Sequence, residues 1–301
     1  MGTITRSTMP DLLWPGIQAI FGINYEKLEK EYTKIFDVRK STKAYEKVTE
    51  ATSMGLAAVK AEGQSIVYDS PTQGPTSTFV HVTYGLGFII TREAMEDNQY
   101  QEVAEANAAS LPWSMNTTKE IVHANVLNRA FSSSYVGGDG VALISASHPS
   151  VNGTQSNSLG AAADLSESAL EDAITQIATA KNSAGLPIAL RAEALVIGPG
   201  QIFNATRILN SSGRVGTNNN DVNAIKDLGL VPRIIVNHYL DDPDAWFLIT
   251  NAPNGLISYQ RRPLEIEKDE DFDTENKKTK ATERYSAGWG DPRAVFGNPG
   301  A

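Results

Sequence analysis

The sequence predicts an α+β protein in which helices and strands occupy separate stretches of the chain. Several segments place apolar residues every three or four positions, as a helix does when one face covers a core. Other segments alternate apolar and polar residues, or are short apolar runs between turn formers, and these are typical of strands. Strands and helices do not alternate regularly, so we expect no repeated βαβ unit.

The composition is that of an ordered globular protein. The chain has 301 residues, of which 41% are hydrophobic and 20% charged, enough for one large core or two smaller ones. The net charge of −9 argues against a surface that wraps nucleic acid, because that requires an excess of Lys and Arg. The absence of cysteine excludes disulfides and Cys-ligated zinc. We see no secretory signal and no apolar run long enough for a membrane span.

The first 22 residues are apolar and are interrupted by Pro and Gly, which prevents a long helix. Trp14, Ile17 and Phe21 would be costly to leave in water, so we expect this segment to lie on another surface. That surface is either the chain's own domain or a neighbouring molecule, and the sequence does not decide between them. Residues 24–36 then have the spacing of an amphipathic helix.

Residues 62–90 change to the period of strands. Residues 65–68 and 79–84 have strand patterns, and the run of turn formers between them predicts an extended hairpin. Its polar tip would contain Asp69, Pro71 and Gln73. No neighbouring segment offers to cover both faces of the hairpin, so we expect it to project.

Two helices follow with clear signals. Residues 92–131 form the longest helical candidate, with a kink or break expected at Pro112, which lacks an N–H. Ser166 is placed to cap the next helix, while Leu165 and Leu170 stand at the positions of a hydrophobic staple.

The second half of the chain mixes strands with one short helix and one loop. Residues 201–210 predict a helix whose buried side holds Ile202, Phe203, Thr206 and Leu209. Residues 211–229 have the composition of a loop that includes Asn218, Asn219 and Asn220. The pattern predicts strands at 194–197, 234–236 and 246–249, and an antiparallel pair near 264–267 and 279–289 around an acidic turn.

No familiar catalytic or metal-binding motif is present. None of the four histidines has a spacing that would place two metal ligands on one helix face, and there is no nucleophile elbow or phosphate loop. The acidic runs at 241–244 and 269–273 have the composition of solvated turns. We therefore expect no catalytic residue, no cofactor and no metal, while a hydrolase whose residues come from distant segments stays open.

A series of strings in the last two thirds of the sequence carries a family resemblance. In chain order they are Tyr84–Phe88 with Thr91–Ala94, Ala124–Phe131, Gly138–Leu143 with Ser147–Pro149, Gly216–Asn223, Asp244–Leu248, Arg261–Leu264, and Glu283–Ser286 with Gly288–Trp289. Their order and number resemble the major capsid proteins of tailed bacteriophages, in particular the Mu-like major head subunit group.

The resemblance implies the HK97-type capsid fold and assigns each part of the chain a role. Residues 1–59 would be an N-terminal arm with a short helix, and residues 60–91 the E-loop hairpin that reaches over an adjacent subunit. Residues 92–144 and 256–301 would form the peripheral domain around a long spine helix, and residues 145–255 the axial domain. Trp14, Ile17, Phe21, Asp69, Pro71, Gln73 and Asn218–Asn220 are then candidate contacts between subunits.

The resemblance also implies partners and a location. The protein would form pentamers and hexamers of an icosahedral shell that encloses double-stranded DNA without reading its sequence. It would work with a separate scaffold protein, a portal and in some systems a decoration protein, in the virion and, during assembly, in the host cytoplasm. We expect no Lys–Asn cross-link at the hairpin tip, since residues 70–75 contain no Lys.

Other functions share parts of this pattern. An encapsulin-type compartment shell would have the same fold but hold enzymes, and a tail tube or sheath subunit would build open helical assemblies. Closed shells require contacts repeated around rotation axes, whereas an open helix does not close.

The arm provides the first test. Removal of residues 1–22 should lower the yield of assembled particles and leave the monomer folded, because the resemblance implies that this segment is an arm with contacts to neighbouring subunits. Electron microscopy of particles and circular dichroism of the monomer measure the two effects. Unchanged particle yield would contradict a role in assembly.

Overall fold

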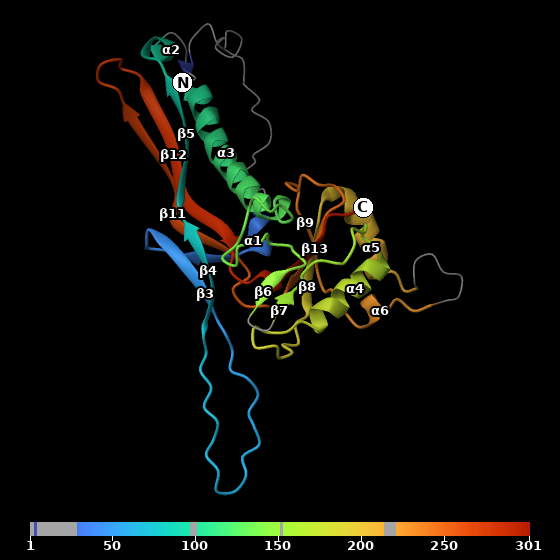
Figure 1. The fold of residues 1–301 in the computed structure, drawn as a ribbon. Coiled ribbons are helices and arrows are strands. Elements are labelled where there is room, and N and C mark those ends of the chain that lie inside the picture. The colour runs from blue at the N-terminus through green and yellow to red at the C-terminus, as the bar shows by residue number, and fades with distance from the viewer. Residues whose placement is uncertain (1–2, 5–28, 97–100, 151–152, 214–220) are drawn as a thin grey trace.

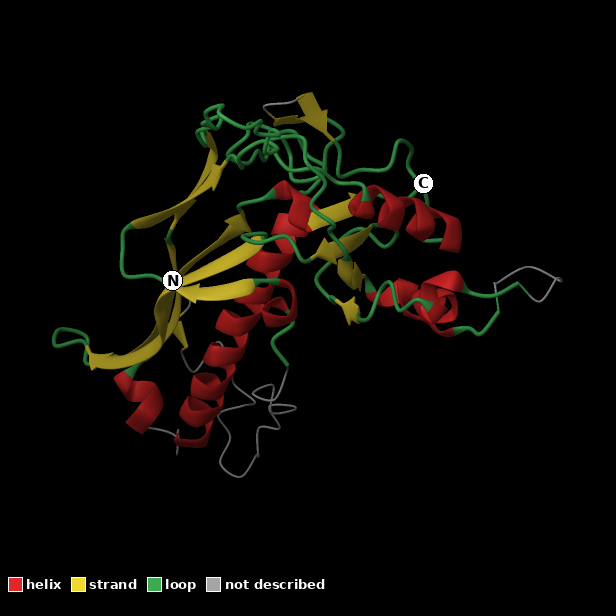
Figure 2. Ribbon diagram, turned by 90° about the horizontal axis from the view of Figure 1, so that it is seen from below, coloured by secondary structure: helices red, strands yellow, loops and turns green. Residues whose placement is uncertain are grey.

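The computed structural model describes residues 3–4, 29–96, 101–150, 153–213 and 221–301. Two bodies lie side by side, one built on a long, narrow sheet and the other on a short sheet covered by helices (Figure 1). A hairpin projects from the region between them. Seen from below, the long strands lie on one side of helix α3 and the short sheet with its helices lies on the other (Figure 2).

The long sheet has five strands in the order β1-β5-β12-β11-β2. Its centre is the antiparallel pair of β11 and β12, and β5 runs antiparallel to β12. The short strands β1 and β2 add in parallel at the two edges. The strands span Thr3–Ile4 (β1), Asp37–Lys40 (β2), Val82–Ile90 (β5), Leu256–Glu270 (β11) and Lys277–Trp289 (β12).

Helix α3 (Gln101–Asn128) packs along one face of this sheet, and the short helices α1 (Tyr32–Ile35) and α2 (Arg92–Glu96) lie near its two ends. Leu111 and Met115 of α3 are buried against Ala281 of β12. The helix runs through Pro112 without the predicted break. The buried neighbours of Pro112 hold both halves of the helix on the sheet, which offsets the hydrogen bond that proline cannot make.

The second body has a four-stranded sheet in the order β13-β10-β8-β9. Its core is continuous with the helices that cover it and includes the fully buried Trp246, Leu170 and Leu195. The strands span Ala192–Ile197 (β8), Ile234–Val236 (β9), Trp246–Thr250 (β10) and Val295–Asn298 (β13). The helices span Glu167–Ala178 (α4), Ile202–Asn210 (α5) and Ala224–Asp227 (α6), with 3₁₀ turns at Pro199–Gln201 (η2) and Pro292–Ala294 (η3). A small hairpin of β6 (His148–Ser150) and β7 (Gly153–Gln155) completes it.

The start of α4 follows the prediction. The Ser166 side chain accepts a hydrogen bond from the backbone N–H of Ala169, as an N-cap does. Leu165 and Leu170 are both buried in the same apolar cluster.

The buried side of α5 is different from the predicted one: Phe203 is 75% exposed, and the core side consists of Ala205, Ile208 and Leu209. Leu209 is thus buried as predicted, while Ala205 and Ile208, at positions i and i+3, take the places expected for Ile202, Phe203 and Thr206.

Two predicted boundaries are wrong. The projecting hairpin begins at β3 (Tyr45–Ala51) and returns in β4 (Gln73–Val80), and not within residues 60–91. Residues 65–68 form no strand, and β5 belongs to the long sheet. The C-terminal segment also leaves the long sheet, because β13 pairs with β10. Both errors have one cause: strand partners distant in sequence leave no local signal.

The expected helix at 24–36 is only partly described. Within the described residues it is one turn, α1, which is followed directly by β2. At the chain's start, β1 pairs with Ile89 and Ile90 of its own β5, so residues 3–4 lie on their own domain.

The side chain of Asn157, which is 2% exposed, joins the segment after α3 to the C-terminal segment. Its amide nitrogen donates to the carbonyl oxygens of Leu143 (2.7 Å), Pro292 (3.0 Å) and Val295 (2.9 Å). Its amide oxygen accepts from the backbone N–H of Ser145 at 2.8 Å. One amide thus holds the segment after α3 against the C-terminal strand.

Replacement of Asn157 by Ala should lower the free energy of unfolding by about 3 kcal/mol or more, because buried carbonyls lose their donor. Urea unfolding of the unassembled protein measures this. The control is Asn210→Ala, whose side chain is exposed and should cost less than about 0.5 kcal/mol. Equal effects of the two substitutions would contradict the role given to Asn157.

Candidate assembly surfaces

Residues 52–72 form a long loop that continues the β3–β4 ribbon away from both bodies (Figure 1). At its root, Thr52 and Thr72 bind each other: the Thr52 N–H donates to the Thr72 carbonyl at 2.9 Å, and the Thr72 N–H donates to the Thr52 hydroxyl at 2.6 Å. Every residue from 53 to 73 is exposed. A segment of this length without cover from its own chain is available to a neighbour.

Asp69 clips the two sides of the loop together and does not form its tip. Its carboxylate accepts the backbone N–H of Gly55 at 2.7 Å and that of Ser70 at 2.8 Å. These two hydrogen bonds lower the pKa of Asp69. The turn at the tip lies at residues 62–63, where Gly63 has a φ of 79°, a conformation that favours glycine.

Pro71 and Gln73 are also far from the tip. Both are exposed at the root of the loop, where Gln73 begins β4. The structure therefore places Asp69, Pro71 and Gln73 on one side of the loop, and the prediction that they form its tip is wrong. The run of turn formers that suggested it bends the chain into β4.

The loop exposes apolar side chains on both faces, including Val59 and Val67 on one, and the larger side chains gather on the other. The pairs Thr52–Thr72 and Gly55–Asp69 continue the register Ala51–Gln73 of the ribbon. The same register places Leu56 opposite Tyr68, and residues two apart on an extended chain share a face. That face holds Met54, Leu56, Ile66 and Tyr68, of which Leu56 is 83% and Tyr68 85% exposed. Apolar side chains at this exposure indicate a surface that another molecule covers.

The base of the ribbon is fixed to the long sheet. Phe79 packs with Ile257 and Tyr259, and Val48 lies against this cluster. The ring of His81 is within 3.0 Å of the hydroxyls of Ser41 and Ser286. These contacts are buried, so the ribbon leaves the body in a defined direction.

The loop after α3 touches the ribbon through Gly138, where a Cβ atom would lie 2.4 Å from the Thr76 carbonyl carbon. Only glycine allows the loop after α3 to approach the ribbon this closely.

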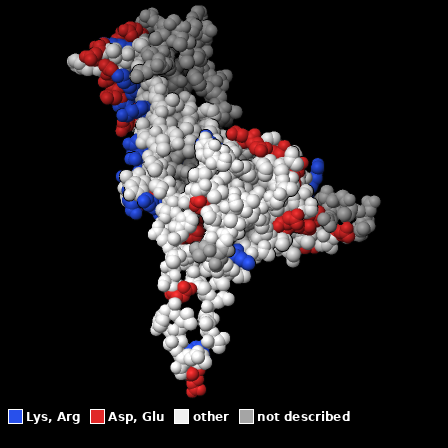
Figure 3. All heavy atoms as spheres, in the orientation of Figure 1, with Lys and Arg blue, Asp and Glu red and all other residues white. Residues whose placement is uncertain are grey.

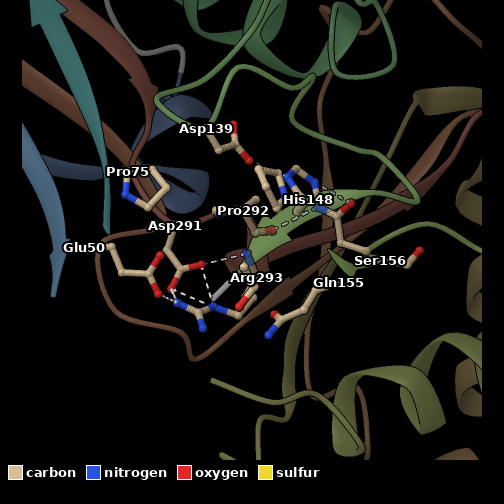
Figure 4. A pocket seen from close by; sticks show the side chains of 13 residues that line it. Glu50, Pro75, Asp139, His148, Gln155, Ser156, Asp291, Pro292 and Arg293 are labelled. Atoms are coloured by element: carbon tan, nitrogen blue, oxygen red, sulfur yellow. Dashed lines mark hydrogen bonds and ion pairs between the residues drawn. The ribbon is translucent and has the colours of Figure 1, made fainter. Parts of the chain in front are cut away.

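An ion cluster ties the same base to the C-terminal segment (Figure 4). Arg293 binds Asp291 with Nε–Oδ1 and Nη2–Oδ2 distances of 2.9 and 2.8 Å, and its Nη2 also binds Glu50 of β3 at 2.5 Å. Burial lowers the pKa of Arg293, but the two carboxylates outweigh burial and raise it. Sequence reasoning missed this cluster, because Glu50 and Arg293 are 243 positions apart.

His148 and Asp139 lie in the same small pocket and are the residues on which a hydrolase would depend. The His148 Nδ1 is 2.6 Å from an Asp139 carboxylate oxygen, as in a catalytic pair. The other ring nitrogen, Nε2, lies 3.1 Å from the amide oxygen of Asn157, and within the described ranges no serine hydroxyl is bonded to it. The pair therefore supports the position of the Asn157 side chain.

A family model described as "Phage capsid protein" matches residues 75–298. The chain belongs to the phage capsid protein family. None of the curated proteins searched matches it.

Solved structures agree on the fold. A chain from Mycobacterium phage Adephagia has a TM-score of 0.57 at 10% identity, with 99% of this chain and 98% of that chain covered. A chain from Mycobacterium phage Che8 has a TM-score of 0.55 at 14% identity, with coverages of 96% and 98%. The bacteriophage JBD30 capsid has a TM-score of 0.51 at 10% identity, with coverages of 98% and 73%.

These matches confirm the predicted HK97-type α+β fold and the role as a major capsid protein of a bacteriophage. The match to a phage family favours that role over an encapsulin-type compartment shell. The narrower resemblance to the Mu-like group stays a prediction. As a capsid protein, the chain is a component of a multi-subunit shell and of the virion.

Six candidate contact residues, namely Trp14, Ile17, Phe21, Asn218, Asn219 and Asn220, lie outside the described residues. Among the described residues, no group of three or more His, Asp or Glu side chains is arranged to hold a metal ion. In that same part of the capsid protein, no helix is long and apolar enough to cross a membrane.

The capsid protein buries several ionisable groups where α3 crosses the long sheet. Lys119 of α3 forms an ion pair with Glu283 of β12, and both side chains are 5% exposed. The Lys119 ammonium also lies 5.0 Å from the ring centre of Tyr285. Next to it, His123 is bonded to the Lys119 carbonyl and the Ser258 hydroxyl, each at 2.7 Å. A carbonyl only accepts, so the neutral ring carries its proton on Nδ1.

Burial lowers the pKa of His123 to about 4, below its value of 6.5 in an unfolded chain. The unfolded chain therefore binds more protons between these values, and folding stability falls as the pH falls from 6.5 to 4. The loss from this group is roughly 3 kcal/mol. The neighbouring Glu120 affects the pH dependence of stability in the opposite direction. Burial raises the pKa of its carboxyl group, so its contribution to folding stability is lost as the pH rises.

His123→Gln should flatten the fall in stability below pH 6.5, because it removes the group that gains the proton on unfolding. Urea unfolding of the unassembled protein at several pH values, compared with the unsubstituted chain, measures the difference. The contribution of Glu120 is present in both proteins and cancels. Parallel pH profiles would contradict the assignment to His123.

Proposed function

We propose that this capsid protein forms the pentamers and hexamers of an icosahedral shell that encloses double-stranded DNA. The observation that supports this best is the loop 52–72, which projects with an exposed apolar face from a base fixed by buried contacts. In a shell each subunit has several neighbours, and contacts that are individually weak gain strength together. A monomer in water gains nothing from such a loop, since the exposed face costs solubility.

Each part of the chain takes a role in this proposal. The hairpin formed by residues 45–80 is the E-loop, and the long sheet with α3 is the peripheral domain. Residues 145–255 together with β13 are the axial domain, which meets its copies around five- and six-fold centres. The arm and the loop with Asn218–Asn220 contribute further contacts between subunits.

Assembly takes place in the host cytoplasm, with a separate scaffold protein, a portal and in some systems a decoration protein. Identical subunits can close into shells of more than one size, and such partners select one of them. The net charge of −9 lets a wall of this protein stand beside DNA without binding it tightly or reading its sequence. The role of the protein is structural and requires no catalysis.

The loop face provides the test of this proposal. Replacing Leu56 and Tyr68 together by Ser should reduce the yield of closed particles by about tenfold or more, because the neighbour no longer covers apolar surface. Both side chains are exposed, so the monomer should unfold at the same urea concentration as the unsubstituted protein. Particles are counted by electron microscopy and sedimentation.

The matched control is Gln64→Ser on the same exposed loop, which removes no apolar surface and should assemble normally. Full particle yield from the double variant would contradict the role of the loop. Open tubes from the unsubstituted protein would contradict the closed shell.

A further inference from the structure

The far end of the long sheet carries one fully exposed aromatic residue in an acidic setting. Phe272, in the turn between β11 and β12, is 96% exposed. Five carboxylates surround it in sequence: Asp269, Glu270, Asp271, Asp273 and Glu275. Figure 3 shows acidic side chains gathered at this end of the molecule. We refer to residues 269–275 as the acidic tip.

Only part of the tip's charge is neutralised within the chain. Asp271 pairs with Lys278, and Glu275 pairs with Arg92 of α2. Asp269, Glu270 and Asp273 form no ion pair with any described residue. An exposed phenyl ring with unpaired carboxylates on both sides has the pattern of a contact anchor, an apolar centre inside a polar rim.

The opposite end of the sheet carries the complementary pattern. Tyr45 of β3 faces Val80 of β4 in the ribbon, and they are 52% and 64% exposed. The Lys47 ammonium lies 5.6 Å from the ring centre of Tyr45. Lys43 is held nearby, where its carbonyl accepts from Arg261 Nε at 3.2 Å. We refer to Lys43, Tyr45, Lys47, Val80 and Arg261 as the basal patch.

The basal patch also has unpaired charge. Lys47 and Arg261 form no ion pair within the part of the chain that the structure describes. Lys43 reaches Glu46 at 3.4 Å, and its side chain is 74% exposed. Figure 3 shows Lys and Arg along the edge of the long strands, mixed with Asp and Glu toward the acidic end and without them lower down. Lys277 and Lys278 stand across the strands from Glu270 and Asp269, yet carboxylates outnumber cations in the acidic tip and cations outnumber carboxylates in the basal patch.

We propose that the acidic tip of one subunit docks on the basal patch of a second copy, with Phe272 against Tyr45 and Val80. Tip and patch lie at opposite ends of the long strands, so one chain cannot bring its own pair together (Figure 1). The contact is head-to-tail, the type that closes into rings or shells when repeated around an axis. The proposal rests on the proposed shell function and names one of its contacts.

Charge decides between this arrangement and a contact between tips. Three tips meeting around an axis would place their unpaired carboxylates side by side, which is destabilising. On the basal patch the same carboxylates meet Lys and Arg, while burial of Phe272 supplies the apolar contribution. Exposed ion pairs are individually weak and mainly set register and partner, so salt should weaken the contact.

Charge reversal tests the pairing. Asp273→Lys and Lys47→Glu should each reduce the yield of particles by roughly tenfold, and the double variant should regain most of the loss, because the attraction is restored with its sign exchanged. Lys181→Glu, an exposed reversal away from both surfaces, is the matched control. Urea unfolding of each monomer shows that the fold is unchanged.

Cysteine cross-linking tests the contact directly, since the chain has no cysteine of its own. Particles assembled from a mixture of Asp273→Cys and Lys47→Cys chains should give a disulfide-linked dimer on a non-reducing gel. Neither variant alone should do so, because tip-to-tip and patch-to-patch distances exceed those of a disulfide.

Each other outcome overturns the docking in a recognisable way. Normal particles from both single reversals, or a double variant as defective as the singles, would exclude the pairing and leave the shell function intact. Dimers from Asp273→Cys alone would show contact between tips. If Lys47→Glu lowered only the nucleic acid retained by normal particles, the patch would be a phosphate site. Failure of the unsubstituted protein to assemble when it is produced together with its scaffold protein would count against the shell function itself.

Discussion

The direction of the projecting hairpin depends on Arg293. Its guanidinium is partly buried between Asp291 at the start of η3 and Glu50 near the end of β3, so it joins the C-terminal segment to the hairpin base. Loss of one partner would leave a partly buried charge with one carboxylate fewer, which is destabilising. The cluster therefore serves orientation: it keeps a loop with no cover of its own aimed at a fixed place on a neighbour.

A second buried charge pair has the same effect on the long sheet. Lys119 and Glu283 join the middle of α3 to β12, and Tyr285 packs beside them with the Lys119 ammonium over its ring. The helix cannot slide along the strands without separating these two charges in an apolar environment. The peripheral body is thus stiff along its length, and its two ends stay at a fixed separation, which contacts repeated around a shell require.

The sequence predicts those features that depend on neighbouring residues, and it misses those that depend on residues far apart in the chain. The cap of Ser166 and the apolar period of α4 are local, and the structure has both. The predicted position of the hairpin strands is wrong because residues 45–51 have charged side chains on both faces of the strand, so their pattern is not that of a half-buried strand. Only pairing with Gln73–Val80 makes this segment a strand. Arg293, Glu50 and Asn157 left no signal, since their partners are distant in sequence. The family resemblance supplied the projecting loop's role, which no local pattern contains.

The distribution of apolar surface explains how one chain can be both a stable monomer and a shell component. The cores of the two bodies are closed by their own side chains, among them Trp246, Phe247 and Tyr285, each 1% exposed or less. The large apolar side chains left outside these cores include Leu56, Tyr68 and Phe272, which stand on the loop and on the turn farthest from both cores. Folding therefore does not depend on those residues, and burying them is left to the neighbour. A protein built this way can fold first and assemble afterwards, because the two steps use different side chains.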